Sequence, residues 1–175
     1  MTKRYVDFTD YAGEIIRAMK KGILLTTKAG NKTNSMVIGW GTLGTNWVKP
    51  TFVTYVRESR FSRQLLAENP EFTINVPLGE VSAEALKICG SKSGRDMDKL
   101  SAAGLTAVEP DVISVPGIKE FPLTLECRVT YVQAQEPEQL EPDLMERHYP
   151  ADENGARDRH VSFYGEIVSA YIIEE

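Results

Sequence analysis

The residues best suited to chemistry lie in segment 57–62, which reads RESRFS. We predict that a strand ends and a helix begins here, which leaves the first helical amides unpartnered and favours an anion. Arg57 and Arg60 suit bidentate contacts with phosphate oxygens, while Ser59 and Ser62 have hydroxyls to donate. A plainer interpretation also fits, in which Ser62 caps the helix and the arginines are solvated surface charges.

A second segment, 34–41, reads NSMVIGWG and has the composition of a strand that begins with an asparagine. Glycine at position 39 would let a flat ring lie close to the backbone, whose amides and carbonyls could read the ring edge. Taken alone, this pattern fits a buried strand with a glycine at a bulge better than it fits a binding site.

A third segment, 89–99, is polar, contains two glycines and leads into a predicted helix. It could supply amides and cations to a ligand. The GxxxxGK[ST] spacing is absent, which argues against a nucleoside triphosphatase. We interpret Cys89 as a small buried thiol and Cys127 as a core residue.

The two histidines do not form a catalytic group with a neighbouring nucleophile. His148 lies in a polar segment, where we expect it to be solvated. His160 begins the last predicted strand, where it is either structural or orients a substrate. No serine or cysteine stands in a nucleophile-elbow context, and no CxxC or Cys/His cluster indicates zinc.

The composition is that of a globular protein, with 42% hydrophobic and 26% charged residues in a chain of 175. We therefore expect one domain over residues 1–175. The net charge of -5 argues against a nucleic-acid partner. No apolar run approaches the ~20 residues of a membrane span, and the first residues do not resemble a secretory signal. With only two cysteines, we expect a cytoplasmic protein without a membrane partner.

The elements that must position these residues are mostly strands. Hydrophobic patterning predicts strands at 23–28, 35–41, 51–57, 72–76, 123–135 and 160–173, a short extended segment at 113–115, and helices at 7–21, 62–69, 82–89 and 96–103. We expect residues 43–50 to be irregular and residues 136–159 to form a variable surface excursion. The strands lack regular crossover helices, which favours a mainly β, mostly antiparallel barrel with flanking helices.

Taken in order, the segments resemble the flavin reductase-like FMN-binding split-barrel family, especially its flavoredoxin-type branch. The resemblance covers about residues 15–173, and it is carried by NSMVIGW at 34–40, RESRFS at 57–62, FTINVP at 72–77, the 89–99 segment, PLTLEC at 122–127 and the strand from His160 through GEIV at 165–168. It implies a six-stranded antiparallel split β-barrel that forms a homodimer and holds FMN near the subunit interface. Trp40, Trp47 and Phe163 are the expected contacts between subunits.

The resemblance also implies roles for individual residues. Arg57, Ser59, Arg60 and Ser62 would bind the flavin phosphate. The strand residues expected to contact the flavin are Asn34, Ser35, Met36, Val37 and Gly39, with Trp40 packed beside the ring. Ser93 and Lys99 are candidates for the ring edge or the nicotinamide side, and Asn75 and His160 are further candidates. No catalytic side chain is expected, because flavin carries the chemistry.

Three functions remain open from the sequence. The first is an NAD(P)H:flavin oxidoreductase that transfers a hydride from NAD(P)H to flavin and electrons onward to an acceptor. The second is a flavoredoxin-like FMN electron carrier with little NAD(P)H activity, which would work with a redox partner protein. The third is a split-barrel binding protein without flavin.

Overall fold

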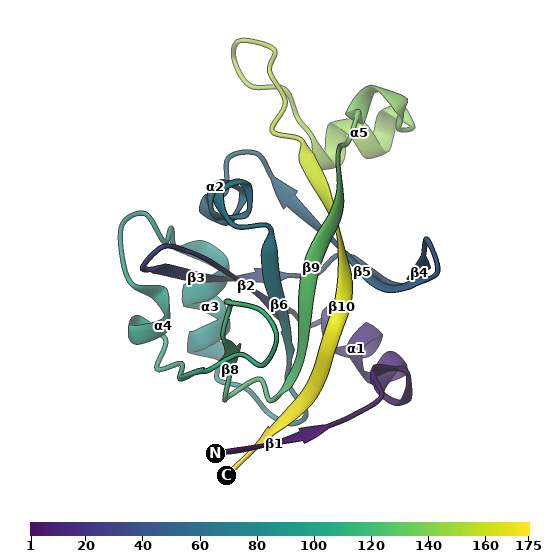
Figure 1. Cartoon of the computed structure of the whole chain (residues 1–175). Coiled ribbons are helices and arrows are strands. Elements are labelled where there is room, and N and C mark those ends of the chain that lie inside the picture. Colours follow the sequence, from purple (N-terminus) through teal and green to yellow (C-terminus); the bar gives the residue numbers. More distant parts are fainter.

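One coiled antiparallel sheet forms the centre of the computed structural model, which describes residues 1–175 (Figure 1). Its eight strands are β1 (Thr2–Tyr5), β2 (Ile23–Ala29), β3 (Lys32–Ile38), β4 (Gly41–Asn46), β5 (Lys49–Arg57), β6 (Glu71–Val76), β9 (Leu123–Ala134) and β10 (His160–Glu174). The strand order is β3-β2-β6-β9-β10-β5-β4, with β1 paired to β10. A separate two-stranded ladder joins β7 (Ala107–Val108) to β8 (Gly117–Ile118).

Short helices cover the sheet and extend one end of it. They are η1 (Phe8–Tyr11), α1 (Ala12–Met19), α2 (Phe61–Glu68), α3 (Ala83–Ser91), α4 (Lys99–Ala102), η2 (Pro137–Gln139) and α5 (Pro142–His148). The helices α2, α3 and α4 pack against β2 and β3, whereas α5 lies beyond the paired ends of β9 and β10 (Figure 1). None of the helices is both long and apolar enough to cross a membrane.

The main core fills the inside of the sheet with apolar side chains from α1, α2 and six strands, among them Ile15, Ile23, Phe52, Phe72, Ile74 and Leu125. Gly165 is required for this packing, because a Cβ there would lie 2.4 Å from Cζ of Phe72. The β9–β10 register shifts at this glycine, with Thr130 of β9 as the additional residue. A second core under α3 and α4 includes Leu24, Cys89 and Leu100. It anchors the loop between these helices beside β3.

The structure confirms the mainly β class, the antiparallel pairing and the flanking helices. The sheet has eight strands instead of the predicted six, because β1 and β4 extend it. The prediction that residues 43–50 are irregular is wrong, since β4 pairs with β5 as a hairpin. The turn of this hairpin holds Trp47 and Val48 at φ values of 48° and 60°. Positive φ angles favour Gly, Asn or Asp, so this turn carried no recognisable signal.

One further segment contains helices that the sequence did not predict. The predicted excursion at 136–159 contains η2 and α5, each of which has a proline in its first turn. Proline is compatible with a helix start because the first amides need no intrahelical acceptor.

Candidate functional site

Two adjoining hollows of about 220 Å³ each run along β3, and we call them together the β3 groove. They share Met36, Val37 and Arg60. The cationic end is lined by β3, the start of α2 and the loop between α3 and α4. The apolar end is lined by the second half of β3 and by residues 39–40, together with side chains from β5 and β10.

The cationic end concentrates positive charge in a chain of net charge -5. Four basic side chains line it, namely Arg60, Lys92, Arg95 and Lys99. No aspartate or glutamate lines it. Charges of one sign gathered in a concave site raise the local concentration of a ligand of opposite sign. This end of the groove is therefore suited to an anion.

Lys99 is the most buried of these cations, with 3% of its surface exposed. Its Nζ donates one hydrogen bond, of 2.8 Å, to the carbonyl oxygen of Cys89, and it forms no ion pair. Burial lowers the pKa of Lys99, because a charge in a poorly hydrated site is costly. An anion in the groove would compensate this charge, so Lys99 fits a phosphate group.

Polar groups with free hydrogen-bonding capacity also line the cationic end of the groove. Asn34 Nδ2 and Thr27 Oγ1 both donate to Ser62 Oγ, at 2.9 and 3.2 Å, which leaves the Ser62 hydroxyl proton free for a ligand oxygen. Asn34 Oδ1 is buried and has no partner. A buried acceptor without a donor is costly, so a ligand hydroxyl or N–H would stabilise it. Gly94 permits this arrangement, because a Cβ there would lie 2.1 Å from Asn34 Oδ1.

Arg60 stands where the two ends of the groove meet. It is the residue before α2, has an extended backbone and carries an exposed side chain. Ser62 is the second helical residue and is buried, so the interpretation of Ser62 as the helix cap is wrong. Arg95 is held nearby, with Nη1 donating to the Ser59 carbonyl at 3.1 Å and the guanidinium 5.4 Å from the Phe61 ring centroid.

Two predicted phosphate ligands are engaged by the chain itself. Arg57 donates from Nη1 to the Asp158 carbonyl at 2.5 Å and from Nη2 to the His148 carbonyl at 2.7 Å. The backbone amide and the hydroxyl of Ser59 donate to the two carboxylate oxygens of Asp158, at 3.1 and 2.6 Å. Both residues line the groove, but their donors hold the segment before β10 in place.

The apolar end presents the strand and an aromatic wall. A Cβ at Gly39 would meet only the Met19 carbonyl oxygen, at 3.7 Å, so packing within the chain does not require glycine there. The Trp40 ring lies between two imidazoles, 5.2 Å from His148 and 5.1 Å from His160 between centroids. Burial and the nearby Arg57 guanidinium lower the pKa of His160 to about 4. This imidazole is therefore neutral at physiological pH.

The fold brings eleven of the twelve predicted site residues to the β3 groove: Asn34, Met36, Val37, Gly39, Trp40, Arg57, Ser59, Arg60, Ser62, Ser93 and Lys99. Ser35 lines neither end. Its hydroxyl is buried and lies 2.8 Å from Thr26 Oγ1. Asn75 is likewise buried in a hydrogen-bond network that includes the Ile118 amide. Phe163 belongs to the main core and is not available as a subunit contact.

The sequence predictions missed Lys92, Arg95 and Tyr55. The signal for the first two was present, since three basic residues fall within positions 92–99. Tyr55 carried no local signal, because a tyrosine in a strand is common.

Comparison with known proteins identifies the family of this chain. Residues 16–175 match the family model described as the flavin reductase like domain. An uncharacterized protein from Archaeoglobus fulgidus is 38% identical over 74 residues, which is 42% of this chain and 41% of that protein. The match thus spans less than half of that relative's length.

Solved structures share the fold. A flavoredoxin from Methanosarcina acetivorans is 27% identical, with a TM-score of 0.65 over 87% of this chain and 68% of that one. An NADH:FAD oxidoreductase from Streptomyces globisporus is 18% identical, with a TM-score of 0.63 over 97% and 87% of the two chains. The second likeness shows the fold alone. Because the family model covers nearly the whole sequence, the chain belongs to the flavin reductase-like family.

Proposed function

We propose that the chain binds FMN in the β3 groove and is a flavin-dependent oxidoreductase that takes hydride from NAD(P)H and passes electrons to an acceptor. The observation that carries this proposal is the polarity of the groove, which joins a cluster of basic side chains to an apolar strand face. FMN has the same polarity, with a phosphate at one end and a flat ring at the other. A solved structure of this fold from Shewanella baltica is described as an FMN-binding domain of a flavin reductase-like enzyme.

The residues of the groove divide the binding between them. Lys99, Arg60 and Arg95 would neutralise the phosphate, and the Ser62 hydroxyl would donate to it. Asn34 Oδ1 would accept from a hydroxyl of the ribityl chain. Residues 36–39 would face the ring. When bound, the flavin supplies the hydride and electron chemistry, while these residues bind and orient it.

A titration with FMN followed by NADH tests the proposal. We expect the protein to quench FMN fluorescence on binding, and anaerobic NADH or NADPH to bleach the visible flavin absorption. The Lys99→Met variant should lose FMN binding, and Lys87→Met, at an exposed cation on α3 outside the groove, should not. A protein that takes up no FMN contradicts the proposal.

A flavoredoxin-like electron carrier is the second candidate, and the 27% identity with a flavoredoxin favours it. The same titration separates the two functions. A carrier would bind FMN equally well, but its absorption bands would persist with NADH and NADPH and bleach only with a chemical reductant.

We further propose that the chain forms a homodimer through the face around the β4–β5 turn. Trp47 lies there against Tyr131 and Tyr164, with ring centroids 5.5 and 5.9 Å away, and Val48 is 96% exposed. Light scattering at micromolar concentration should give twice the monomer mass. The Trp47→Lys variant should give the monomer mass, and a wild-type monomer would contradict the proposal.

A further inference from the structure

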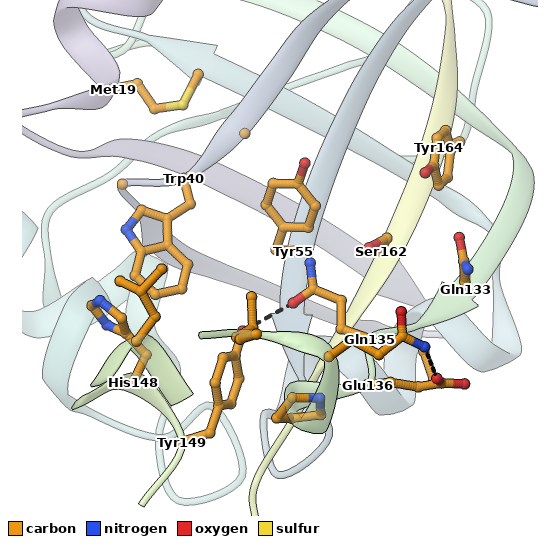
Figure 2. Close-up of a pocket in the computed structure, with 17 residues that line it drawn as sticks. Met19, Trp40, Tyr55, Gln133, Gln135, Glu136, His148, Tyr149, Ser162 and Tyr164 are labelled. Carbon is orange, nitrogen blue, oxygen red and sulfur yellow. Dashed lines mark hydrogen bonds between the residues drawn. The ribbon is translucent and has the colours of Figure 1, made fainter. Parts of the chain in front are cut away.

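A larger cavity adjoins the apolar end of the β3 groove at Trp40, and we call it the α5 cavity (Figure 2). Its volume is about 780 Å³, and it shares Gly39, Trp40 and Tyr55 with the groove. The ends of β9 and β10 and the η2–α5 segment form its other walls. Sites for small molecules commonly have volumes of about 300–1,000 Å³, so this one has room for a ligand of its own.

The charge of the α5 cavity differs from that of the groove's cationic end. No lysine or arginine lines it, and its only carboxylate is that of Glu136, which accepts a hydrogen bond from the Gln139 amide. His148 is its only other ionisable side chain apart from tyrosines. An anion entering the cavity would lose its hydration without gaining a cationic partner. The cavity therefore discriminates against phosphorylated ligands and carboxylates.

The walls of the α5 cavity are rich in aromatic and aliphatic surface. Trp40, Tyr55, Tyr149 and Tyr164 lie around it (Figure 2). The helix α5 contributes Leu144. Aromatic side chains pack best against flat partners, in offset-stacked or edge-to-face arrangements. This lining favours a planar ring system.

Two uncommitted polar groups also face the α5 cavity. The Ser162 hydroxyl and the Gln133 amide line it, and neither side chain makes a hydrogen bond within the chain (Figure 2). Both can donate and accept, so they suit a hydroxyl or carbonyl group without requiring charge on the ligand.

The end of α5, which forms one side of the α5 cavity, is held in place by hydrogen bonds within the chain. Arg57 donates to the His148 carbonyl at 2.7 Å, and Arg157 donates to the Tyr149 carbonyl and, at 2.6 Å, to Glu146. The Tyr149 hydroxyl donates to Gln135 Oε1 at 2.9 Å (Figure 2). These bonds tie the end of α5 to β5, to Gln135 directly after β9 and to the segment before β10, so hydrogen bonds within the chain define this side of the cavity.

We propose that the α5 cavity is a second ligand site, which binds an uncharged planar aromatic molecule bearing a hydroxyl or carbonyl group. Phenols and quinones belong to this class. The site differs in charge from the cationic end of the β3 groove, with which it shares no residue, and it shares only Gly39, Trp40 and Tyr55 with the apolar end. Binding there needs no flavin, so the proposal stands or falls independently of the proposed function.

Calorimetric titration of the flavin-free chain with 2-naphthol and 2-naphthoate tests the site, because the two probes differ mainly in charge. We expect 2-naphthol to bind and to quench tryptophan fluorescence through Trp40, and 2-naphthoate to bind at least about ten-fold more weakly. Leu144→Ala should weaken 2-naphthol several-fold. Leu78→Ala is the matched control, because Leu78 and Leu144 are both 41% exposed and Leu78 lies outside the cavity.

A variant with an added positive charge provides a second test. Gln133→Lys places a cation in the α5 cavity at an exposed strand position, so it should improve 2-naphthoate binding. In this variant the affinity for 2-naphthol should exceed that for 2-naphthoate by less than about two-fold. The proposal is overturned by equal wild-type affinities for the two probes, or by an unchanged affinity in Leu144→Ala. It is also overturned if 2-naphthol binding disappears as the chain self-associates, because a second copy would then fill the cavity. A chain that binds 2-naphthol but not FMN would retain this site and lose the proposed function.

Discussion

Asp158 holds Ser59 with both oxygens of its carboxylate, Oδ1 accepting from the backbone amide at 3.1 Å and Oδ2 from the hydroxyl at 2.6 Å. An acidic side chain of the chain itself thus occupies donors that the sequence predicted for a phosphate. Arg57 is engaged by the same segment. The basic groups left for an anion are therefore Arg60, Lys92, Arg95 and Lys99.

A pair of arginine variants distinguishes these two sets of donors. We expect Arg60→Ala to weaken FMN binding by about ten-fold or more, because charge-assisted contacts to phosphate contribute about 1.5–3 kcal/mol. Arg57→Ala should weaken it less than about three-fold and should instead lower the free energy of unfolding, since its bonds fix the segment before β10. FMN titration and urea unfolding of both variants measure this. Equal losses of FMN affinity would mean that Asp158 gives way to the phosphate.

Lys99→Met should separate stability from binding. The substitution removes a buried charge that has no ion-pair partner, so we expect the flavin-free protein to gain about 1 kcal/mol in free energy of unfolding. FMN affinity should fall at least about ten-fold, because the phosphate loses its most buried cation. Urea unfolding and FMN titration of the same preparation provide both values. A variant that loses stability and keeps its FMN affinity would show that Lys99 is structural.

Gly94→Ala tests the close approach of the loop to β3. An added Cβ would lie 2.1 Å from Asn34 Oδ1, so the loop or the asparagine must move. We expect weaker FMN binding together with a loss of about 1–3 kcal/mol in stability. Gly79→Ala is the matched control, because no atom lies within 4 Å of its Cβ position. Equal behaviour of the two variants would argue against a role for Gly94 in shaping the groove.

His160 makes stability depend on pH. Its pKa is about 4 in the folded chain, where burial and then Arg57 disfavour the imidazolium, against 6.5 as its ordinary value. The unfolded chain therefore binds a proton between pH 6.5 and pH 4 that the folded chain does not. Stability from this group is fully present above pH 6.5, is lost as the pH falls to about 4, and changes no further below that.

The size of this effect follows from the shift in pKa. At about 1.36 kcal/mol per pH unit, the loss amounts to about 3 kcal/mol across the window. His160→Gln should remove this part of the slope, while other titrating groups contribute equally to both proteins. Urea unfolding at pH 7 and pH 5 for the two proteins gives the difference. Parallel slopes would mean that the folded chain protonates His160 as readily as the unfolded one.

The sequence by itself determined the local elements and the prediction of an anion site among them. The apolar run at 23–28, the turn at Gly30 with its φ of 55° and the following strand specified the β2–β3 hairpin. Arg57 and Arg60, at the expected start of a helix, indicated an anion site. Both features depend on short-range sterics, hydrophobic periodicity and charge, which neighbouring residues express without the rest of the fold.

Only the tertiary structure decided which residues of these elements face the groove. Asn34 lies at the groove beside Ser62 of α2, 28 positions away, whereas the Ser35 hydroxyl is paired with Thr26 on the neighbouring strand. The pairing of His160 with Arg57 in β10 and β5 brings Asp158 to Ser59 across 99 positions of sequence. The α5 cavity likewise needs β5, β9, β10 and α5 together. Such contacts arise from long-range strand register, which no local pattern of residues records.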